Sequence, residues 1–187
     1  MYVGMFISRN KDNENVANFH SRSELFFMET ENFHDYQYLF KEFVNKGVPG
    51  EMSRFYVSIS PRNMEKTQKE LACRLIKDSV DLSNLNNLAI SIAMKAEQEV
   101  NKKWLFDFDC CDSYEVTRFC MAIRNMDITA DYYHTPNGFS VVVEHGFDCR
   151  YLLETWNSYL KTRNPKYNIE LKRNAMQVVM WDTKFGE

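Results

Sequence analysis

Alternating and continuous runs of apolar residues mark the strands predicted along this chain. Side chains of a strand point to opposite faces in turn, so apolar residues at every second position are typical of a half-buried strand. Such runs, bounded by polar and turn residues, predict seven strands, at residues 23–28, 54–60, 103–109, 128–134, 139–144, 167–172 and 176–181. The last two are separated by a turn at Arg173 and Asn174, and we expect them to form a hairpin.

Apolar residues spaced three and four positions apart predict helices at residues 35–46, 61–77, 88–101 and 148–161. Ser60 and Pro61 are expected to begin the second of these, because serine is a favoured N-cap and proline suits the first helical position. Its buried side is expected to carry Leu71, Leu75 and Ile76.

One more helix is predicted to begin at Asp112 or Ser113, either of which can cap it, and to end at Arg124. The apolar residues of this helix that face inward are Val116, Phe119, Cys120 and Ile123. Polar residues predict loops at 9–23 and 78–87.

The resulting element order is β-α-β-α-α-β-α-β-β-α-β-β, which predicts an α+β fold with a mixed or antiparallel sheet and helices packed against it. The chain has 187 residues, 44% of them hydrophobic, and fits one folded domain spanning 1–187. Residues 1–50 are expected to form an N-terminal extension or subdomain, for which the sequence predicts no role.

Charge and cysteine content narrow the function class. A formal net charge of -3 argues against binding nucleic acid by bulk charge alone. The five cysteines are odd in number and contain no CxxC pair, so we expect free thiols rather than disulfides or a structural zinc site. No signal-peptide pattern and no apolar run of membrane-spanning length is found, so we expect a cytoplasmic protein with no membrane partner.

Two carboxylates on one predicted strand carry the sharpest indication of chemistry. In Trp104-Leu105-Phe106-Asp107-Phe108-Asp109, strand alternation places Asp107 and Asp109 on the same face. Two like charges on a largely apolar strand need compensation, and a divalent cation such as Mg²⁺ or Mn²⁺ supplies it. The alternative is a solvated strand end, or acids that cap the following helix.

A second group of candidates is the turn Thr135-Pro136-Asn137-Gly138-Phe139-Ser140. Its glycine can let backbone amides and the Ser140 hydroxyl approach a phosphate, although an ordinary hairpin explains the same residues. Basic and aromatic residues offer a path for a triphosphate or nucleic acid, and the alternative is a set of solvated charges and half-buried rings. These residues are Arg54, Arg62, Lys172, Arg173, Tyr132, Tyr133 and Tyr167.

In chain order, these segments resemble the motifs of the archaeo-eukaryotic primase superfamily, most of all the small primase-polymerase-like proteins found in phages. The segments are Phe106–Asp109, Thr135–Val143 and Ile169–Asn174. In that family two acids on a strand bind metal, a small residue-x-His after a Gly turn contacts the nucleotide, and a hydrophobic or basic residue followed by an acid completes the metal site. The resemblance covers residues 54–181 and implies a primase-like core with an RRM-like second half.

The resemblance also implies roles for individual residues. Asp107 and Asp109 are expected to be catalytic metal ligands, with Asn174 standing where the third acid falls and ligating through its carbonyl oxygen. The nucleotide phosphates are expected to contact Arg62, Asn137, Gly138, Ser140 and Lys172. Ser140 stands where the family has its histidine. A different alignment gives the missing roles to His134, Glu144, His145 or Asp148.

The expected function is metal-dependent binding of a nucleoside triphosphate or single-stranded nucleic acid, with nucleotidyl transfer to a 3′ hydroxyl on a template. The missing histidine and third acid leave an alternative open, a catalytically inactive descendant of the fold that binds nucleic acid or a host protein factor. Sequence motifs of P-loop NTPases, α/β-hydrolases, dinucleotide-binding folds and zinc peptidases are absent.

Overall fold

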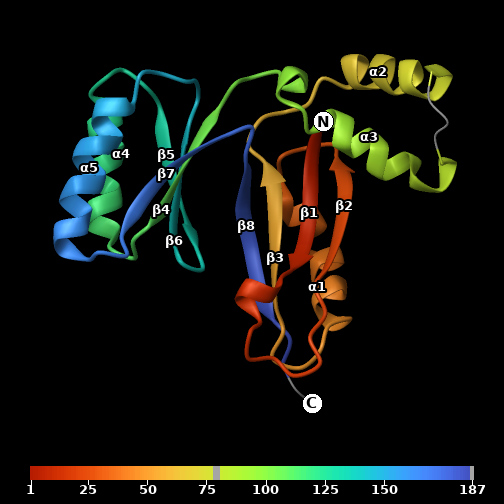
Figure 1. Cartoon of the computed structure of the whole chain (residues 1–187), viewed down its shortest axis with the longest axis horizontal. Coiled ribbons are helices and arrows are strands. Elements are labelled where there is room, and N and C mark those ends of the chain that lie inside the picture. Colours follow the sequence, from red (N-terminus) through yellow and green to blue (C-terminus); the bar gives the residue numbers. More distant parts are fainter. Residues whose placement is uncertain (78–80, 186–187) are drawn as a thin grey trace. The chain divides into compact units, whose positions relative to one another are not determined.

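The computed structural model describes residues 1–77 and 81–185 (Figure 1). Packing divides the chain into two compact units, which are described separately below. Unit 1 comprises residues 1–100 and 178–187, and unit 2 comprises residues 101–177. Unit 2 is therefore inserted in the sequence between two parts of unit 1. The single domain predicted over 1–187, with its core at 54–181, stays a prediction.

Two sheets are formed by the strands in the described ranges, namely β1 (Tyr2–Ser8), β2 (Arg22–Met28), β3 (Met52–Ser58), β4 (Trp104–Asp109), β5 (Ala130–Thr135), β6 (Gly138–Val143), β7 (Asn168–Arg173) and β8 (Met176–Thr183). The α-helices are α1 (Gln37–Asn45), α2 (Met64–Lys77), α3 (Leu85–Ala93), α4 (Ser113–Arg124) and α5 (Arg150–Arg163). Short 3₁₀ helices are η1 (Asn10–Asp12), η2 (Phe33–Tyr36), η3 (Leu82–Asn84) and η4 (Ala96–Gln98). The predicted α+β class is confirmed. No helix in these described ranges is both long and apolar enough to cross a membrane.

The sheet of unit 1 has the strand order β2-β1-β3-β8. Strand β1, one of the two inner strands, is antiparallel to both β2 and β3, with Gly4 opposite Phe26 on one side and Val57 on the other. An aromatic core joins this sheet to α1, where the Phe6 ring lies 5.5 Å from the ring of Phe40 and 4.8 Å from that of Phe55. These contacts bury Phe40 and Phe43, as the spacing over 35–46 predicts, but Leu39 of the same predicted apolar side is 47% exposed.

Strand β1 lies in the segment for which the sequence predicts no element. Residues Tyr2–Ser8 read YVGMFIS, a nearly continuous apolar run with a glycine, and have no clean period of two. Such a run is typical of a strand paired on both sides and covered on both faces. The observed order is otherwise the predicted one with this strand added at its start.

The predicted hairpin of the last two strands is wrong. β7 pairs with β4 in the sheet of unit 2, whereas β8 joins β3 in the sheet of unit 1. Asn174, in the connection between them, has a φ of 50°, which is in the left-handed region. Neighbouring strands in sequence usually pair, and here each finds a more distant partner.

The start of α2 also differs from the prediction. Ser60 and Pro61 precede the helix, which begins at Met64. Asn63 caps it instead, since its side-chain oxygen accepts a hydrogen bond from the Lys66 amide at 3.0 Å.

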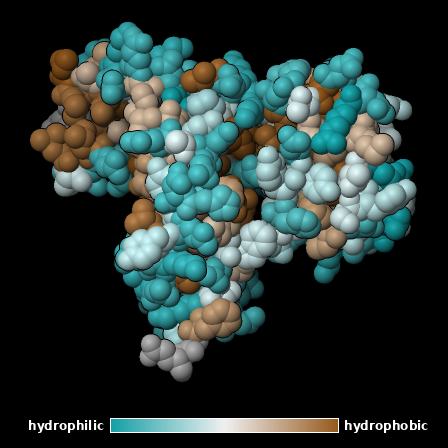
Figure 2. Space-filling model, turned by 180° about the vertical axis from the view of Figure 1, so that it is seen from behind, coloured by the Kyte–Doolittle hydropathy of each residue, from teal (hydrophilic) through white to brown (hydrophobic). Residues whose placement is uncertain are grey.

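Leu75 and Ile76, near the C-terminal end of α2, were predicted to be buried. The structure shows them 38% and 85% exposed. Leu82, 70% exposed, lies at the start of η3. Figure 2 shows hydrophobic atoms gathered at the end of the α2–α3 pair. The packed part of α2 lies nearer its start, against α3 and η4, and includes the fully buried Thr67. The loop predicted for 78–87 falls partly outside the described residues, and its last part, from Leu85, belongs to α3.

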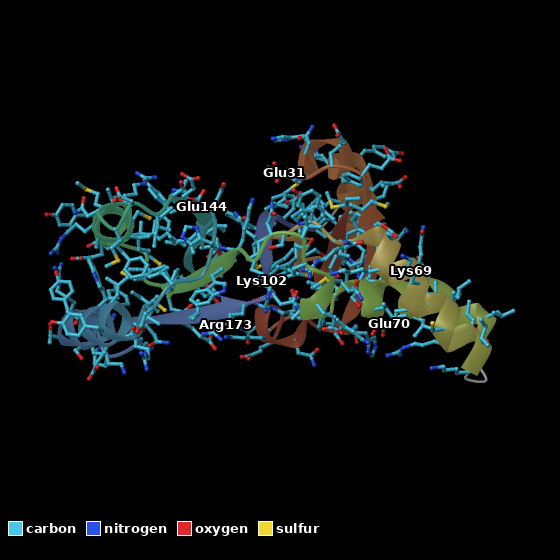
Figure 3. The ribbon with its side chains drawn as sticks, turned by 90° about the horizontal axis from the view of Figure 1, so that it is seen from above. Glu31, Lys69, Glu70, Lys102, Glu144 and Arg173 are labelled. Atoms are coloured by element: carbon cyan, nitrogen blue, oxygen red, sulfur yellow. The ribbon has the colours of Figure 1, made fainter. Side chains whose placement is uncertain are left out.

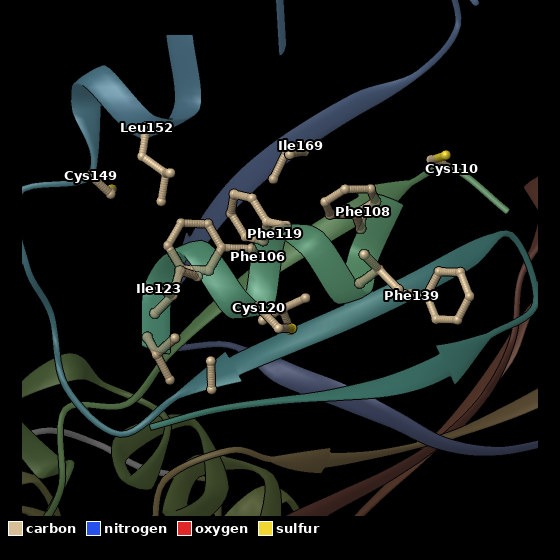
Figure 4. Packing of buried hydrophobic residues seen from close by; sticks show 14 of the residues in the cluster. Phe106, Phe108, Cys110, Phe119, Cys120, Ile123, Phe139, Cys149, Leu152 and Ile169 are labelled. Carbon is tan, nitrogen blue, oxygen red and sulfur yellow. The ribbon is translucent and has the colours of Figure 1, made fainter. Parts of the chain in front are cut away.

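Unit 2 has the element order β4-α4-β5-β6-α5-β7 and the strand order β5-β6-β4-β7, with every neighbouring pair antiparallel. Both helices cover the same face of the sheet (Figure 1). Between sheet and helices, Phe106 and Phe108 of β4 pack with their rings 5.4 Å from the Phe119 ring of α4, as Figure 4 shows. α4 begins at Ser113 with Asp112 as its cap, and its predicted inward residues are all buried.

A candidate metal and phosphate site on the sheet of unit 2

Strand alternation divides the side chains of β4 between the two faces of the sheet. Phe106 and Phe108 point into the core under α4 and α5, so Leu105, Asp107 and Asp109 point to the opposite face. We call this opposite face the carboxylate face. The prediction that both aspartates share a face away from the phenylalanines is met by this geometry.

Register adds residues from the flanking strands to the carboxylate face. Directly opposite Asp107 lie Ser140 of β6 on one side and Glu170 of β7 on the other. Tyr133 of β5 lies opposite Ser140, and Asn168 lies opposite Asp109. Opposed residues in antiparallel strands have their Cβ atoms about 4.5–5.5 Å apart, so the carboxylates of Asp107 and Glu170 are neighbours.

Glu170 is the functional candidate that sequence reasoning missed. It lies in the segment compared with the third family motif, where Ile169-Glu170 is a hydrophobic residue followed by an acid. Only the register of β7 against β4 shows that this acid, rather than Asn174, faces Asp107. The sequence shows the pair Ile169-Glu170, but it does not show that β7 pairs with β4 in the register that places Glu170 opposite Asp107.

Lys172 compensates the charge of these carboxylates. Its Nζ donates a hydrogen bond to Oδ2 of Asp107 and lies 3.8 Å from Oε2 of Glu170. Partial burial alone lowers the pKa of the Lys172 ammonium, but the hydrogen bond to Asp107 and the charges of Asp107, Glu170 and Asp109 outweigh it and raise the pKa. The side chains of Asp107 and Lys172 are 29% and 42% exposed, so water reaches the pair.

The turn between β5 and β6 lies beside the end of β4. Cys111 Sγ donates to the Asn137 carbonyl oxygen at 3.7 Å, which places the exposed tip of the turn next to the residues that follow Asp109. A Cβ atom at Gly138 would overlap the carbonyl oxygen of Phe108 and lie 3.0 Å from the amide nitrogen of Cys110. Glycine is needed here because β6 begins in direct contact with the backbone of β4.

Two predicted site residues are not on the carboxylate face of the unit 2 sheet. Arg62 belongs to unit 1, where its fully buried guanidinium lies 3.8 Å from Glu99. Asn174 follows Arg173, which pairs with Trp104 at the opposite end of β4 from Asp109. At roughly 3.4 Å per residue, that separation is at least about 17 Å. The structure therefore does not bring Asn174 to the aspartates.

The residues of the alternative alignment also lie away from Asp109. Glu144 and His145 follow Val143, which pairs with Trp104, so they stand at the end of β6 that lies farthest from Asp109. Asp148 is engaged by Arg150, whose side chain and backbone amide hydrogen-bond to it and lower its pKa to about 2. His134 lies against Phe139, with ring centres 4.6 Å apart, on the face of the helices.

The predicted basic pair is split by strand alternation. Lys172 faces the carboxylates, whereas Arg173 (Figure 3) lies over the Trp104 ring, 4.5 Å from its centre. Tyr133 shares the carboxylate face with Lys172 and is 46% exposed. Tyr132 points to the other face, with its ring 5.8 Å from that of Phe139.

The donor chemistry fits a hard divalent cation. Asp107, Asp109 and Glu170 offer carboxylate oxygens, which Mg²⁺ and Mn²⁺ prefer, and Lys172 shows that this part of the face holds a positive charge. In the arrangement described for residues 1–77 and 81–185, no three His, Cys, Asp or Glu side chains already stand together as a metal-binding group. Comparison of the chain with protein-family models and with curated protein sequences found no match.

Proposed function

We propose that this protein is a primase-polymerase-like protein that binds a nucleoside triphosphate or single-stranded nucleic acid through Mg²⁺ or Mn²⁺. The observation that carries the proposal is the row of carboxylates on one sheet face, Asp107 and Asp109 on β4 with Glu170 opposite Asp107 on β7. The order β4-α4-β5-β6-α5-β7, with sheet order β5-β6-β4-β7, is the split βαβ arrangement and supports the RRM-like second half that the resemblance implies.

In this proposal each group of the face has a separate task. Asp107, Asp109 and Glu170 hold the cation, which when bound neutralises phosphate oxygens and stabilises charge at the reacting phosphorus. The exposed Asn137 and the backbone at Gly138, beside the end of β4, line the phosphate side of the site. Tyr133, exposed on the same face, offers a ring on which a base can stack. The reaction is nucleotidyl transfer, in which the oxygen of a 3′ hydroxyl bonds to the α-phosphorus of the triphosphate, pyrophosphate leaves and the hydroxyl proton passes to water.

Ser140 favours a second candidate, an inactive descendant that binds without turnover. It stands where the family has its histidine, and its side chain is 3% exposed directly opposite Asp107. An ordinary serine hydroxyl does not titrate near neutral pH and cannot replace an imidazole as a proton donor or as a cation facing phosphate. In this second candidate function the protein still binds the cation and the nucleotide, and it acts by recognising nucleic acid or a protein partner.

The first test is a thermal-unfolding titration with Mn²⁺ and a nucleoside triphosphate. A ligand at a hundred times its Kd adds about 2.7 kcal/mol, which for a chain of this length raises Tm by about 5–10 °C. We expect this joint shift in the wild type and its loss in Asp107→Asn/Asp109→Asn. The matched control Glu144→Gln/Glu154→Gln removes two exposed charges of unit 2 and should keep the shift.

The proposal fails if the wild type shows no shift, or if the aspartate variant shifts as much as the wild type. Primer synthesis and primer extension on single-stranded DNA then separate the two versions. Incorporation that requires Asp107 and Asp109 supports nucleotidyl transfer. Metal-dependent nucleotide binding with no incorporation supports the inactive descendant.

A further inference from the structure

Lys172 stands between two carboxylates in the way that a bound cation would. Its ammonium donates to Asp107 and lies 3.8 Å from Glu170, and both partners project from neighbouring strands onto the carboxylate face. Lys172 itself is opposite Leu105, so it reaches Asp107 diagonally across the strand pair. Without it, Asp107 and Glu170 would be directly opposed like charges, an unfavourable arrangement.

A divalent cation and this ammonium compete for the same oxygens. An ion held by Asp107 and its neighbours adds two positive charges within a few ångströms of Lys172. It also neutralises the carboxylates of Asp107 and Glu170, which hold the ammonium in place. Binding of the ion therefore weakens the contact between Lys172 and Asp107.

Once displaced from Asp107, the Lys172 side chain can bind phosphate oxygens instead. Lysine has a flexible four-carbon stem and a compact charge with three donors, which suits phosphate oxygens. The Lys172 side chain is 42% exposed, and β7 lies at the edge of the sheet beside β4. A triphosphate bound to the ion would place its negative charge on the same face.

We propose that Lys172 exchanges partners, neutralising Asp107 and Glu170 in the metal-free protein and moving to phosphate oxygens when a divalent cation replaces it. This inference rests on the proposed function and adds its regulation. Lys172 then opposes binding of the metal alone and favours binding of metal and triphosphate together. The two ligands are coupled through one side chain, and by linkage each raises the affinity for the other.

The test measures Mn²⁺ and triphosphate affinity separately, by calorimetry, in the wild type and in Lys172→Met. A hydrogen bond to a charged group is worth about a factor of ten in an equilibrium constant. We expect Lys172→Met to bind Mn²⁺ alone about tenfold more tightly and, at saturating Mn²⁺, to bind the triphosphate about tenfold more weakly. Lys166→Met, which removes an exposed lysine from the loop before β7, is the matched control and should change both by less than about twofold.

The opposite signs of the two changes separate this inference from a structural role. A variant that has merely lost stability binds both ligands more weakly, and that result, or an unchanged Mn²⁺ affinity, overturns the exchange. Unchanged triphosphate affinity at saturating Mn²⁺ overturns it as well. Lys172→Arg keeps a cation at the site, so it should hold Mn²⁺ affinity within about threefold of the wild type, and tighter binding there contradicts the competition.

The outcomes also distinguish this inference from the proposed function. Suppose that Mn²⁺ binds the wild type, that Asp107→Asn/Asp109→Asn abolishes this binding, and that Lys172→Met leaves both affinities unchanged. The metal site is then supported and the partner exchange of Lys172 is contradicted. If Mn²⁺ binds neither the wild type nor Lys172→Met, the metal site itself falls. Circular dichroism of each variant establishes that the comparison is between folded proteins.

Discussion

Gly138 shows how one missing side chain positions the candidate site. Its backbone lies against the carbonyl of Phe108 and the amide of Cys110, where any Cβ atom would overlap the main chain of β4. Backbone cannot move aside as a flexible side chain can. The glycine therefore lets β6 begin beside the end of β4 and keeps Ser140 opposite Asp107.

Gly138→Ala is expected to destabilise the protein by more than about 2 kcal/mol, because the new methyl group forces β6 away from β4. Urea unfolding monitored by circular dichroism measures the change. Asn137→Ala, at the exposed neighbouring position, is the control and should stay within about 0.5 kcal/mol of the wild type. Equal stability of the two variants would contradict the close approach.

Side-chain alternation made Asp107 and Asp109 predictable as a pair, since it needs only the strand itself. Glu170 was not predictable in the same way, because its place opposite Asp107 depends on the register between β4, which ends at Asp109, and β7, which begins at Asn168. The burial of Arg62 was not predictable either, for another reason. A basic residue is a phosphate ligand only where it is accessible, and the sequence does not show that its guanidinium is buried against Glu99.

At the scale of elements, Glu51, which lies just before β3, connects that strand to the end of α1 and to the start of β2. Its buried carboxylate accepts hydrogen bonds from the Val48 amide, after α1, at 2.9 Å and from Arg22 Nε, at the start of β2, at 2.8 Å. Burial alone raises the pKa of this carboxyl, but these hydrogen bonds and the Arg22 charge outweigh it and lower the pKa.

A lowered pKa in the folded state means that Glu51 stabilises the protein above about pH 4.5, and that this stabilisation is lost as pH falls through the folded-state pKa. We expect Glu51→Gln to cost about 3 kcal/mol at pH 7 and to flatten the fall in stability between about pH 5 and pH 3. Urea midpoints across that range measure both effects. Glu24→Gln, whose carboxylate is 53% exposed beside Lys46, should leave the pH profile unchanged.

Elements with strong local signals were predictable, and pairings that depend on distant partners were not. The hairpin of β5 and β6 follows from Thr135-Pro136-Asn137-Gly138, and α4 follows from Asp112 and its periodic apolar residues. The pairing of β8 with β3 has no local signal, because its partner lies more than a hundred residues earlier. The predicted burial of Leu75 and Ile76 in α2 was wrong for a similar reason, since periodicity does not show which part of a helix is covered by other elements.

At the scale of the whole molecule, the five cysteines differ in how far packing buries their thiols. Cys73 and Cys111 are exposed, whereas Cys110, Cys120 and Cys149 are buried in unit 2. Burial also raises the pKa of each buried thiol, that of Cys120 to about 11, so these thiols are rarely ionised near neutral pH.

A thiol-reactive dye at neutral pH should therefore label two cysteines quickly and three only when unit 2 opens or unfolds. Mass spectrometry of digested, labelled protein identifies the sites. Cys73→Ser/Cys111→Ser should abolish the fast phase and leave the slow one. Rapid labelling of Cys120 in the native protein would mean that the core under α4 is open.

The crossing of β8 into the first sheet has a consequence for biosynthesis. β3 ends at Ser58 and its neighbour β8 begins at Met176. At roughly 5–20 residues per second, a nascent chain on the ribosome carries an unsatisfied edge on β3 for on the order of 10 s, long enough for residues 101–177 to emerge and fold first. During that interval the open edge can capture a foreign strand, so translation speed and chaperone supply govern the yield of native protein.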